Sequence, residues 1–337
     1  MKLKFRYSLE NFRGVAIIFV MLGHMSSFMD MGTTGNYFHF FFVDATAWFI
    51  FISGYLFFYL EIDRFKYGNY LYKKIKYVIF PYLLLSIPAI LLGLYYSRNI
   101  MHDLTPGMYA LWSLFVGGIV VAPMWFIPMI AIFFLLTPVF NVISRTKLIL
   151  FVTIVSLFFG IFSFRSIYNT NPFFSFLHFS GFYFLGMATA KYTSSLDAMS
   201  NSFKTIIILV SFSVFLLVGV FYPGMENEPM GFLGAYGELN YIILGKLALL
   251  IFIFFIFEKF FNVKNVFLGF LAKISFGLFF IHGFMMLFFS KFLYGFFYPN
   301  SFIKFLCEIV VVIFFSIAVV VLLKRVFGRW SRYVIGC

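Results

Sequence analysis

Long runs of apolar residues, separated by short polar connections, recur from one end of the chain to the other. Each run is about as long as the helix of roughly 20 residues that crosses the hydrocarbon core of a bilayer. A segment in lipid must satisfy its own backbone hydrogen bonds, so an apolar run of this length is expected to be an α-helix. The pattern predicts about ten spanning helices, at 10–29, 38–60, 75–96, 124–143, 147–164, 173–190, 204–222, 239–260, 267–289 and 302–323.

A further apolar stretch, residues 107–121, differs from these runs. It carries Gly117 and Gly118, and Pro123 follows it closely. Glycine and proline interrupt helices, and the stretch is short for a span. We therefore expect a short re-entrant or interfacial segment near 107–121.

The composition agrees with a membrane protein. The chain is 63% hydrophobic and 11% charged, whereas soluble domains are about 25% charged. The longest polar connection, about 223–238, has only 16 residues. We predict one all-α integral membrane bundle over 1–337, with no separate soluble domain. Two cysteines, Cys307 and Cys337, suggest neither a disulfide framework nor a thiol metal site, and we expect no metal.

The basic residues indicate an orientation. The formal net charge is +13, but Lys and Arg lie in short clusters between apolar runs, which favours membrane anchoring over nucleic-acid binding. With ten spans, 18 Lys and Arg lie in connections on the side of the N-terminus and four on the other side. Cytoplasmic loops carry the excess of positive charge. Both termini are therefore expected in the cytoplasm.

Three titratable residues are predicted at one depth, in the outer half of the bundle. His24 lies late in the first run, Asp44 early in the second, and His282 fifteen residues into the ninth. Ionisable groups inside a bilayer are costly and often functional. Imidazole takes up a proton near neutral pH, and a carboxylate can fix its tautomer, so the group suits general acid–base chemistry. The alternative is that each histidine simply bonds a neighbouring carbonyl or hydroxyl.

Several cations are predicted in the cytoplasmic half. They are Arg13, Lys73, Lys74, Lys76 and Lys273. Cations of this kind bind phosphate groups, so they would suit a phosphorylated donor that arrives from the cytoplasm. The alternative, for the three lysines before the third run, is anchoring to anionic lipid. Arg13 and His24 are separated by roughly 16 Å along one helix.

Motifs spread along the chain resemble those of the membrane acyltransferase-3 family. Leu9-Glu10-Asn11-Phe12-Arg13-Gly14, followed by an apolar run to His24, is similar to the family's opening L-D-x-L-R-G and histidine. Other similar segments, in the family's order, are 42–56, 73–82, 124–128, 184–186 and 271–282. Two departures are Glu10 in place of aspartate and lysines in place of the arginines before Pro81-Tyr82.

The resemblance implies a ten-helix enzyme of the bacterial inner membrane. It would transfer an acyl group, usually acetyl from acetyl-CoA, to a hydroxyl of a cell-surface or lipid-linked glycan. By motif match, Arg13 and His24 take the family's essential arginine and histidine, and His282 takes the histidine of a late helix. Acyl-CoA would be a substrate rather than a permanently bound cofactor, and polysaccharide-synthesis proteins are possible partners.

These expectations assign roles to residues. The CoA phosphates would lie near Arg13 and Lys273, with Lys73 and Lys76 assisting. His24 would deprotonate the acceptor hydroxyl for direct attack on the thioester, or would itself be acylated. The carboxylate that orients His24 would be Asp44 or Glu238.

The acceptor side is expected to use Trp125, stacked on a sugar ring, and Glu238. The alternatives are an interfacial tryptophan and a solvated acidic loop. A rival function is a transporter or exporter of a glycan or small molecule, with the intramembrane His and Asp as a proton relay.

Overall fold

The structure of the chain, a computed structural model, describes residues 5–27, 32–96, 104–118, 121–165, 169–221, 239–293 and 301–337. The α-helices in chain order are α1 (Tyr7–Ser26), α2 (Gly32–Phe42), α3 (Thr46–Leu56), α4 (Tyr67–Lys74), α5 (Phe80–Tyr96), α6 (Pro106–Val116), α7 (Phe126–Leu135), α8 (Thr137–Arg145), α9 (Leu148–Ile161), α10 (Pro172–Lys191), α11 (Thr193–Ala198), α12 (Asn201–Phe221), α13 (Tyr241–Phe260), α14 (Val266–Phe292), α15 (Phe302–Phe327) and α16 (Ser331–Val334). The predicted all-α architecture is confirmed.

Seven helices in these ranges are long and apolar enough to cross a membrane. They are Thr34–Arg64, Tyr67–Tyr95, Pro172–Lys191, Asn201–Val220, Tyr241–Phe260, Val266–Phe292 and Phe302–Val334. A bent pair, Ala122–Leu135 and Thr137–Arg145, makes an eighth span if its halves are counted together across their 58° bend. Pro138 lies at the bend, where its missing N–H weakens the helix.

The other two of the ten predicted spans are α1 and α9. α1 has 20 residues but carries Glu10, Arg13 and His24, which reduce its apolar character. α9 has 14 residues, which reach only about 21 Å, so the prediction of a full span at 147–164 was too long. The stretch near 107–121 forms the 11-residue helix α6, which is too short to span, as expected.

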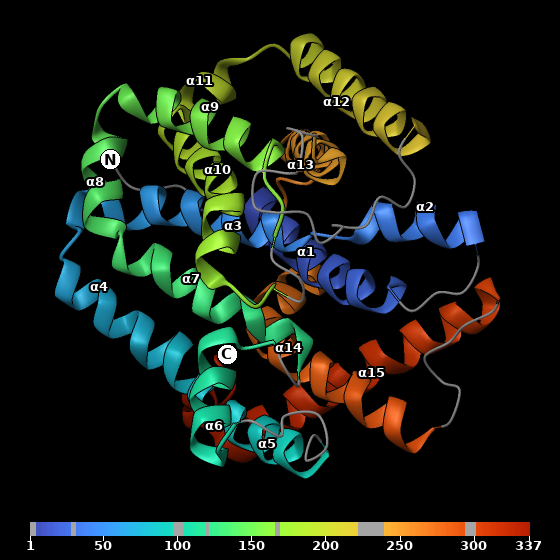
Figure 1. The fold of residues 1–337 in the computed structure, drawn as a ribbon. Helices are drawn as coiled ribbons and strands as arrows, with labels where there is room; N and C mark the ends of the chain where they lie inside the picture. The colour runs from blue at the N-terminus through green and yellow to red at the C-terminus, as the bar shows by residue number, and fades with distance from the viewer. Residues whose placement is uncertain are drawn as a thin grey trace.

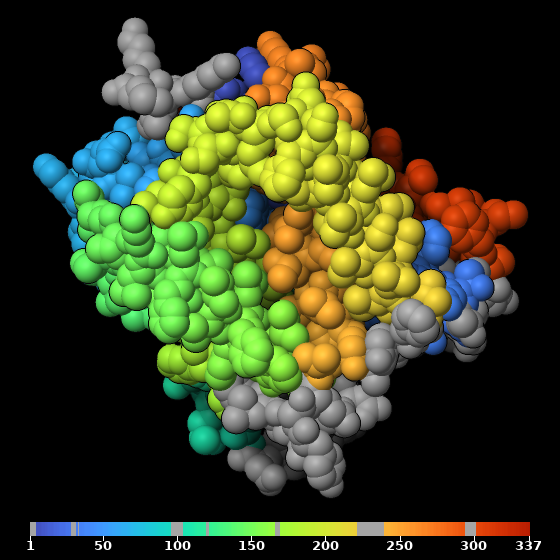
Figure 2. All heavy atoms as spheres, turned by 90° about the horizontal axis from the view of Figure 1, so that it is seen from above, coloured from blue at the N-terminus to red at the C-terminus, as the bar shows by residue number. Residues whose placement is uncertain are grey.

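α1 runs through the centre of the bundle (Figure 1). α3 and α10 pack closely together on one side of it, and α14 packs along its other side. α12 packs against α13 at the periphery. Seen from above, α13 is visible between α9 and α12 (Figure 2). The central position of α1 buries one face of it, including Phe12, Ala16 and Ile17.

α3 and α10 approach so closely that only glycine fits at their contact. A Cβ added to Gly54 would lie 2.0 Å from the carbonyl oxygen of Tyr183. A Cβ added to Gly186 would lie 2.0 Å from the carbonyl oxygen of Phe51. Small residues of this kind let helix backbones approach in membrane proteins.

The predicted second span, 38–60, is interrupted. α2 ends at Phe42, α3 begins at Thr46, and Asp44 between them has a φ of 58°. Asp tolerates this left-handed conformation better than most residues. Lys246 on α13 is fully buried. Its ammonium donates to the carbonyl oxygens of Phe40 at 2.8 Å and Phe41 at 2.7 Å. Broken helices persist inside membranes where neighbouring side chains satisfy the freed backbone groups.

Candidate active site

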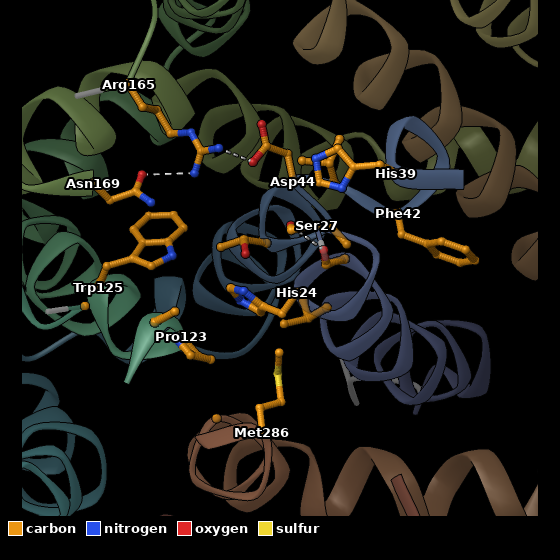
Figure 3. Close-up of a pocket in the computed structure, with 18 of the residues that line it drawn as sticks. His24, Ser27, His39, Phe42, Asp44, Pro123, Trp125, Arg165, Asn169 and Met286 are labelled. Carbon is orange, nitrogen blue, oxygen red and sulfur yellow. Dashed lines mark hydrogen bonds and ion pairs between the residues drawn. The ribbon is translucent and has the colours of Figure 1, made fainter. Parts of the chain in front are cut away.

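The described residues form a cavity of about 750 Å³ at the end of α1, beside the break between α2 and α3. Volumes of this size hold small-molecule ligands. Three helices, α1, α13 and α14, contribute to the walls. The break between α2 and α3, the turn before α7 and the segment that follows α9 contribute the rest. Polar side chains of the lining include Thr46 and Lys291 and, as labelled in Figure 3, His24, Ser27, His39, Asp44, Arg165 and Asn169.

His24 lines the cavity, and the ring of His282 lies behind it, with 5.5 Å between the ring centroids. His282 Nδ1 lies 2.8 Å from the carbonyl oxygen of Leu278. A carbonyl can only accept, so Nδ1 carries the proton and Nε2 keeps its lone pair. That Nε2 atom is buried and has no hydrogen-bond partner in the described residues. The two histidines are therefore adjacent, with a proton acceptor available on the inner ring.

Asp44 lies in the same cavity but pairs with a cation rather than with His24. Its Oδ1 is 2.6 Å from Nη2 of Arg165, and Nη1 of Arg165 donates to Oδ1 of Asn169 at 3.0 Å. Within the described ranges, no side chain hydrogen-bonds His24. The expected Asp44–His24 hydrogen bond is thus absent there; Arg165 pairs with Oδ1 of Asp44 instead. Glu238, the other expected partner, lies outside the described residues.

Trp125 supports Arg165. The guanidinium lies 5.4 Å from the Trp125 ring centre and 5.5 Å from that of Phe179. The Trp125 and Phe179 rings stack at 5.9 Å. Trp125 is 5% exposed and also lines the cavity. The indole therefore holds Arg165 at the cavity wall, and its stacking on a sugar ring stays a prediction.

At the opposite end of α1, Arg13 donates from Nε to Oγ of Ser275 on α14 at 2.8 Å. Lys74 lies close enough for its charge to interact with that of Arg13. Its ammonium lies over the rings of Tyr70 and Phe134, at 5.1 and 4.8 Å. Among the described cations expected to bind the donor, Arg13 and Lys74 therefore lie close together and face inward.

The other expected donor-binding lysines do not join Arg13. Lys273 is exposed; it precedes Ser275 by two positions, which turns it about 200° around the helix and away from Arg13. Lys73 is also exposed. Lys76 lies over the rings of Tyr72 and Tyr333, at 5.3 and 5.1 Å. The structure does not gather these three lysines around Arg13, and their role in donor binding stays a prediction.

The C-terminal residues pack near Arg13. Ser331 donates from Oγ to the carbonyl oxygen of Cys337 at 2.7 Å. A Cβ on Gly277 would lie 2.6 Å from the sulfur of Cys337. Burial raises the pKa of the Cys337 thiol, and the positive charges of Lys324 and Arg13 partly oppose that rise. In the described ranges no three His, Cys, Asp or Glu side chains gather as metal ligands would.

Sequence reasoning missed the importance of two cations. By sequence, Arg165 is one of the four basic residues in connections on the side opposite the N-terminus, and nothing in a single sequence links such a residue to Asp44. Lys246 did carry a signal, because a lysine in the middle of an apolar helix requires a partner. Its carbonyl partners become recognisable only once the break in the second span is known.

The chain matches a family model described as an acyltransferase domain over residues 6–325. No curated protein and no solved structure matches it. The family match covers nearly the whole chain and agrees with a helical membrane fold that carries Arg13 and His24 on one helix. The chain therefore belongs to the membrane acyltransferase-3 family.

Proposed function

We propose that this membrane acyltransferase moves an acetyl group from cytoplasmic acetyl-CoA to a hydroxyl of a cell-surface or lipid-linked glycan. The observation that carries the proposal is the placement of His24 in a cavity at one end of α1, with Arg13 and Lys74 toward the other. Arg13 and His24 are separated by roughly 16 Å along the helix, within reach of an extended pantetheine arm. The donor phosphates bind at Arg13 and Lys74, and the thioester extends to His24.

His24 acts as the general base. It takes the proton of the acceptor hydroxyl, whose oxygen forms a bond to the thioester carbonyl carbon. The carbon–sulfur bond then breaks, and the proton passes from the imidazolium to the departing thiolate, which leaves as CoA. The lone pair on His282 Nε2 accepts the N–H of His24 as the ring turns toward it, which selects the reactive tautomer. The 5.5 Å separation of the rings supports this role.

The test uses purified protein in nanodiscs, acetyl-CoA and the methyl glycosides of glucose, galactose and mannose as acceptor probes. Release of CoA thiol and the mass of the acetylated glycoside are measured. His24→Gln should lower the rate about 100-fold or more, the usual contribution of a general base. Lys264→Ala, at an exposed position, serves as the control. Failure to bind acetyl-CoA, or full activity of His24→Gln, would refute the proposal.

A second measurement isolates the donor site. Arg13→Ala should weaken CoA binding about tenfold, since a hydrogen bond from a charged group is worth about 1.5 kcal/mol or more. Isothermal titration with CoA reports the affinity without catalysis. Unchanged affinity would exclude Arg13 as a phosphate ligand.

A further inference from the structure

Two buried polar atoms on one wall of the cavity have no hydrogen-bond partner in the described part of the chain. They are Oδ2 of Asp44 and Nε of Arg165. The Asp44 side chain is 3% exposed and that of Arg165 is 11% exposed. Buried polar groups are normally hydrogen-bonded, and leaving one unpaired is costly. Asp44 and Arg165 both line the cavity, so a ligand there can satisfy them.

Asn169 adds a third free group to this wall. Its Oδ1 accepts from Arg165 at 3.0 Å, and no group in the described ranges accepts from its amide nitrogen. Asn169 also lines the cavity. Figure 3 shows Arg165, Asp44 and Asn169 grouped together, apart from His24. The wall thus offers a carboxylate acceptor beside amide and guanidinium donors.

The wall is held in place before any ligand binds. Arg165 is fixed by its ion pair with Asp44, its bond to Asn169 and its contacts with the rings of Trp125 and Phe179. Asp44 lies at the break between α2 and α3, where its carbonyl oxygen accepts from the backbone N–H of Ala47 at 2.9 Å. A preorganised site loses less entropy on binding.

We propose that Asp44, Arg165 and Asn169 form an acceptor subsite that binds two adjacent hydroxyls of a pyranose ring. One hydroxyl donates to Oδ2 of Asp44, and its neighbour accepts from the amide of Asn169. A carboxylate only accepts and an amide nitrogen only donates, whereas a sugar hydroxyl does both, so a vicinal diol matches this pair. The subsite rests on the proposed function in one respect: a further hydroxyl of the same sugar is the one that reaches His24. It assigns Asp44 to binding of the acceptor rather than to orientation of His24.

The test measures binding without acetyl-CoA. Methyl glucoside, galactoside and mannoside are titrated against the protein in nanodiscs, with affinity measured by saturation-transfer NMR. Asn169→Gly removes the amide while permitting the φ of 55° found at this residue. It should weaken the best-binding glycoside about tenfold, the effect of one well-placed hydrogen bond. Asn69→Ala, at an exposed position on α4, should bind like the wild type.

Deoxy glycosides distinguish direct contact from a structural effect. For the wild type, a glycoside that lacks the hydroxyl facing Asn169 should bind about tenfold more weakly than the parent glycoside. For Asn169→Gly, the two glycosides should bind equally well. This non-additivity is the signature of a direct interaction. Additive losses for every deoxy position, or no binding of any glycoside at millimolar concentration, would overturn the subsite. Glycoside binding with no acetyl transfer would leave the subsite standing and refute the proposed function.

Discussion

The contact between α3 and α10 allows a quantitative prediction, because Gly54 and Gly186 leave no space for a methyl group. Ordinary contacts of a Cβ begin at 3.4 Å, whereas a Cβ on either glycine would lie 2.0 Å from a backbone oxygen. Gly54→Ala must therefore separate the helices locally by about 1.4 Å, which forfeits a large part of the dispersion energy across the contact. We expect Gly54→Ala to lower the free energy of unfolding by about 3 kcal/mol, the upper end of the usual range for overpacking of a core.

The assay is thermal unfolding of the purified protein in detergent. At a typical unfolding entropy per residue, about 3 kcal/mol lowers the Tm of a chain of this length by roughly 4 °C. Gly186→Ala should lower the Tm by a similar amount. The double variant should lose less stability than the two single variants added together, because one separation of the helices relieves both clashes. Gly68→Ala on α4 is the control, since a Cβ added there would meet no heavy atom within 4 Å. A Tm for Gly54→Ala equal to that of Gly68→Ala would refute the reasoning.

Three other predictions concern charged and thiol groups. Lys74→Ala should weaken CoA binding about tenfold, whereas Lys66→Ala, at an exposed position, should leave it unchanged; equal titration curves would exclude Lys74 from the donor site. Asp44→Asn leaves a buried guanidinium without its counter-ion and should destabilise the protein by about 3–5 kcal/mol; chemical unfolding measures this, and a loss under about 1 kcal/mol would contradict burial of the pair. In a Cys307→Ser background, Cys337 should react with iodoacetamide more slowly than free cysteine at pH 8 and faster as pH rises, because burial raises the pKa of the thiol; a rate equal to that of free cysteine at pH 8 would show that the thiol is accessible and unperturbed.

Much of the architecture can be predicted from the order of apolar and polar residues along the sequence. Apolar run length predicts the helical spans, because lipid offers no partners for backbone groups. Spacing along the runs also predicts that His24, Asp44 and His282 lie at similar depth, and the structure brings His24 and Asp44 into one cavity with His282 behind His24.

Direction around a helix was harder to predict than depth along it. Lys273 lies on the same helix as Ser275, yet only the latter faces Arg13. The partner of Asp44 depends on the path of the chain after α9, which brings Arg165 to the cavity. Neither fact is encoded in hydrophobic periodicity, because both depend on how separate helices are rotated against one another.

The bond between Lys246 and the end of α2 has a consequence for biogenesis. Lys246 lies 206 residues after Phe40, whose carbonyl it binds. A ribosome completes the second span long before it makes α13, so these carbonyls must first be satisfied by water, lipid headgroups or the insertion machinery. Insertion of the second span and final assembly of its break are therefore separate events. The cavity beside that break is completed late in synthesis, after α13 and α14 have entered the membrane.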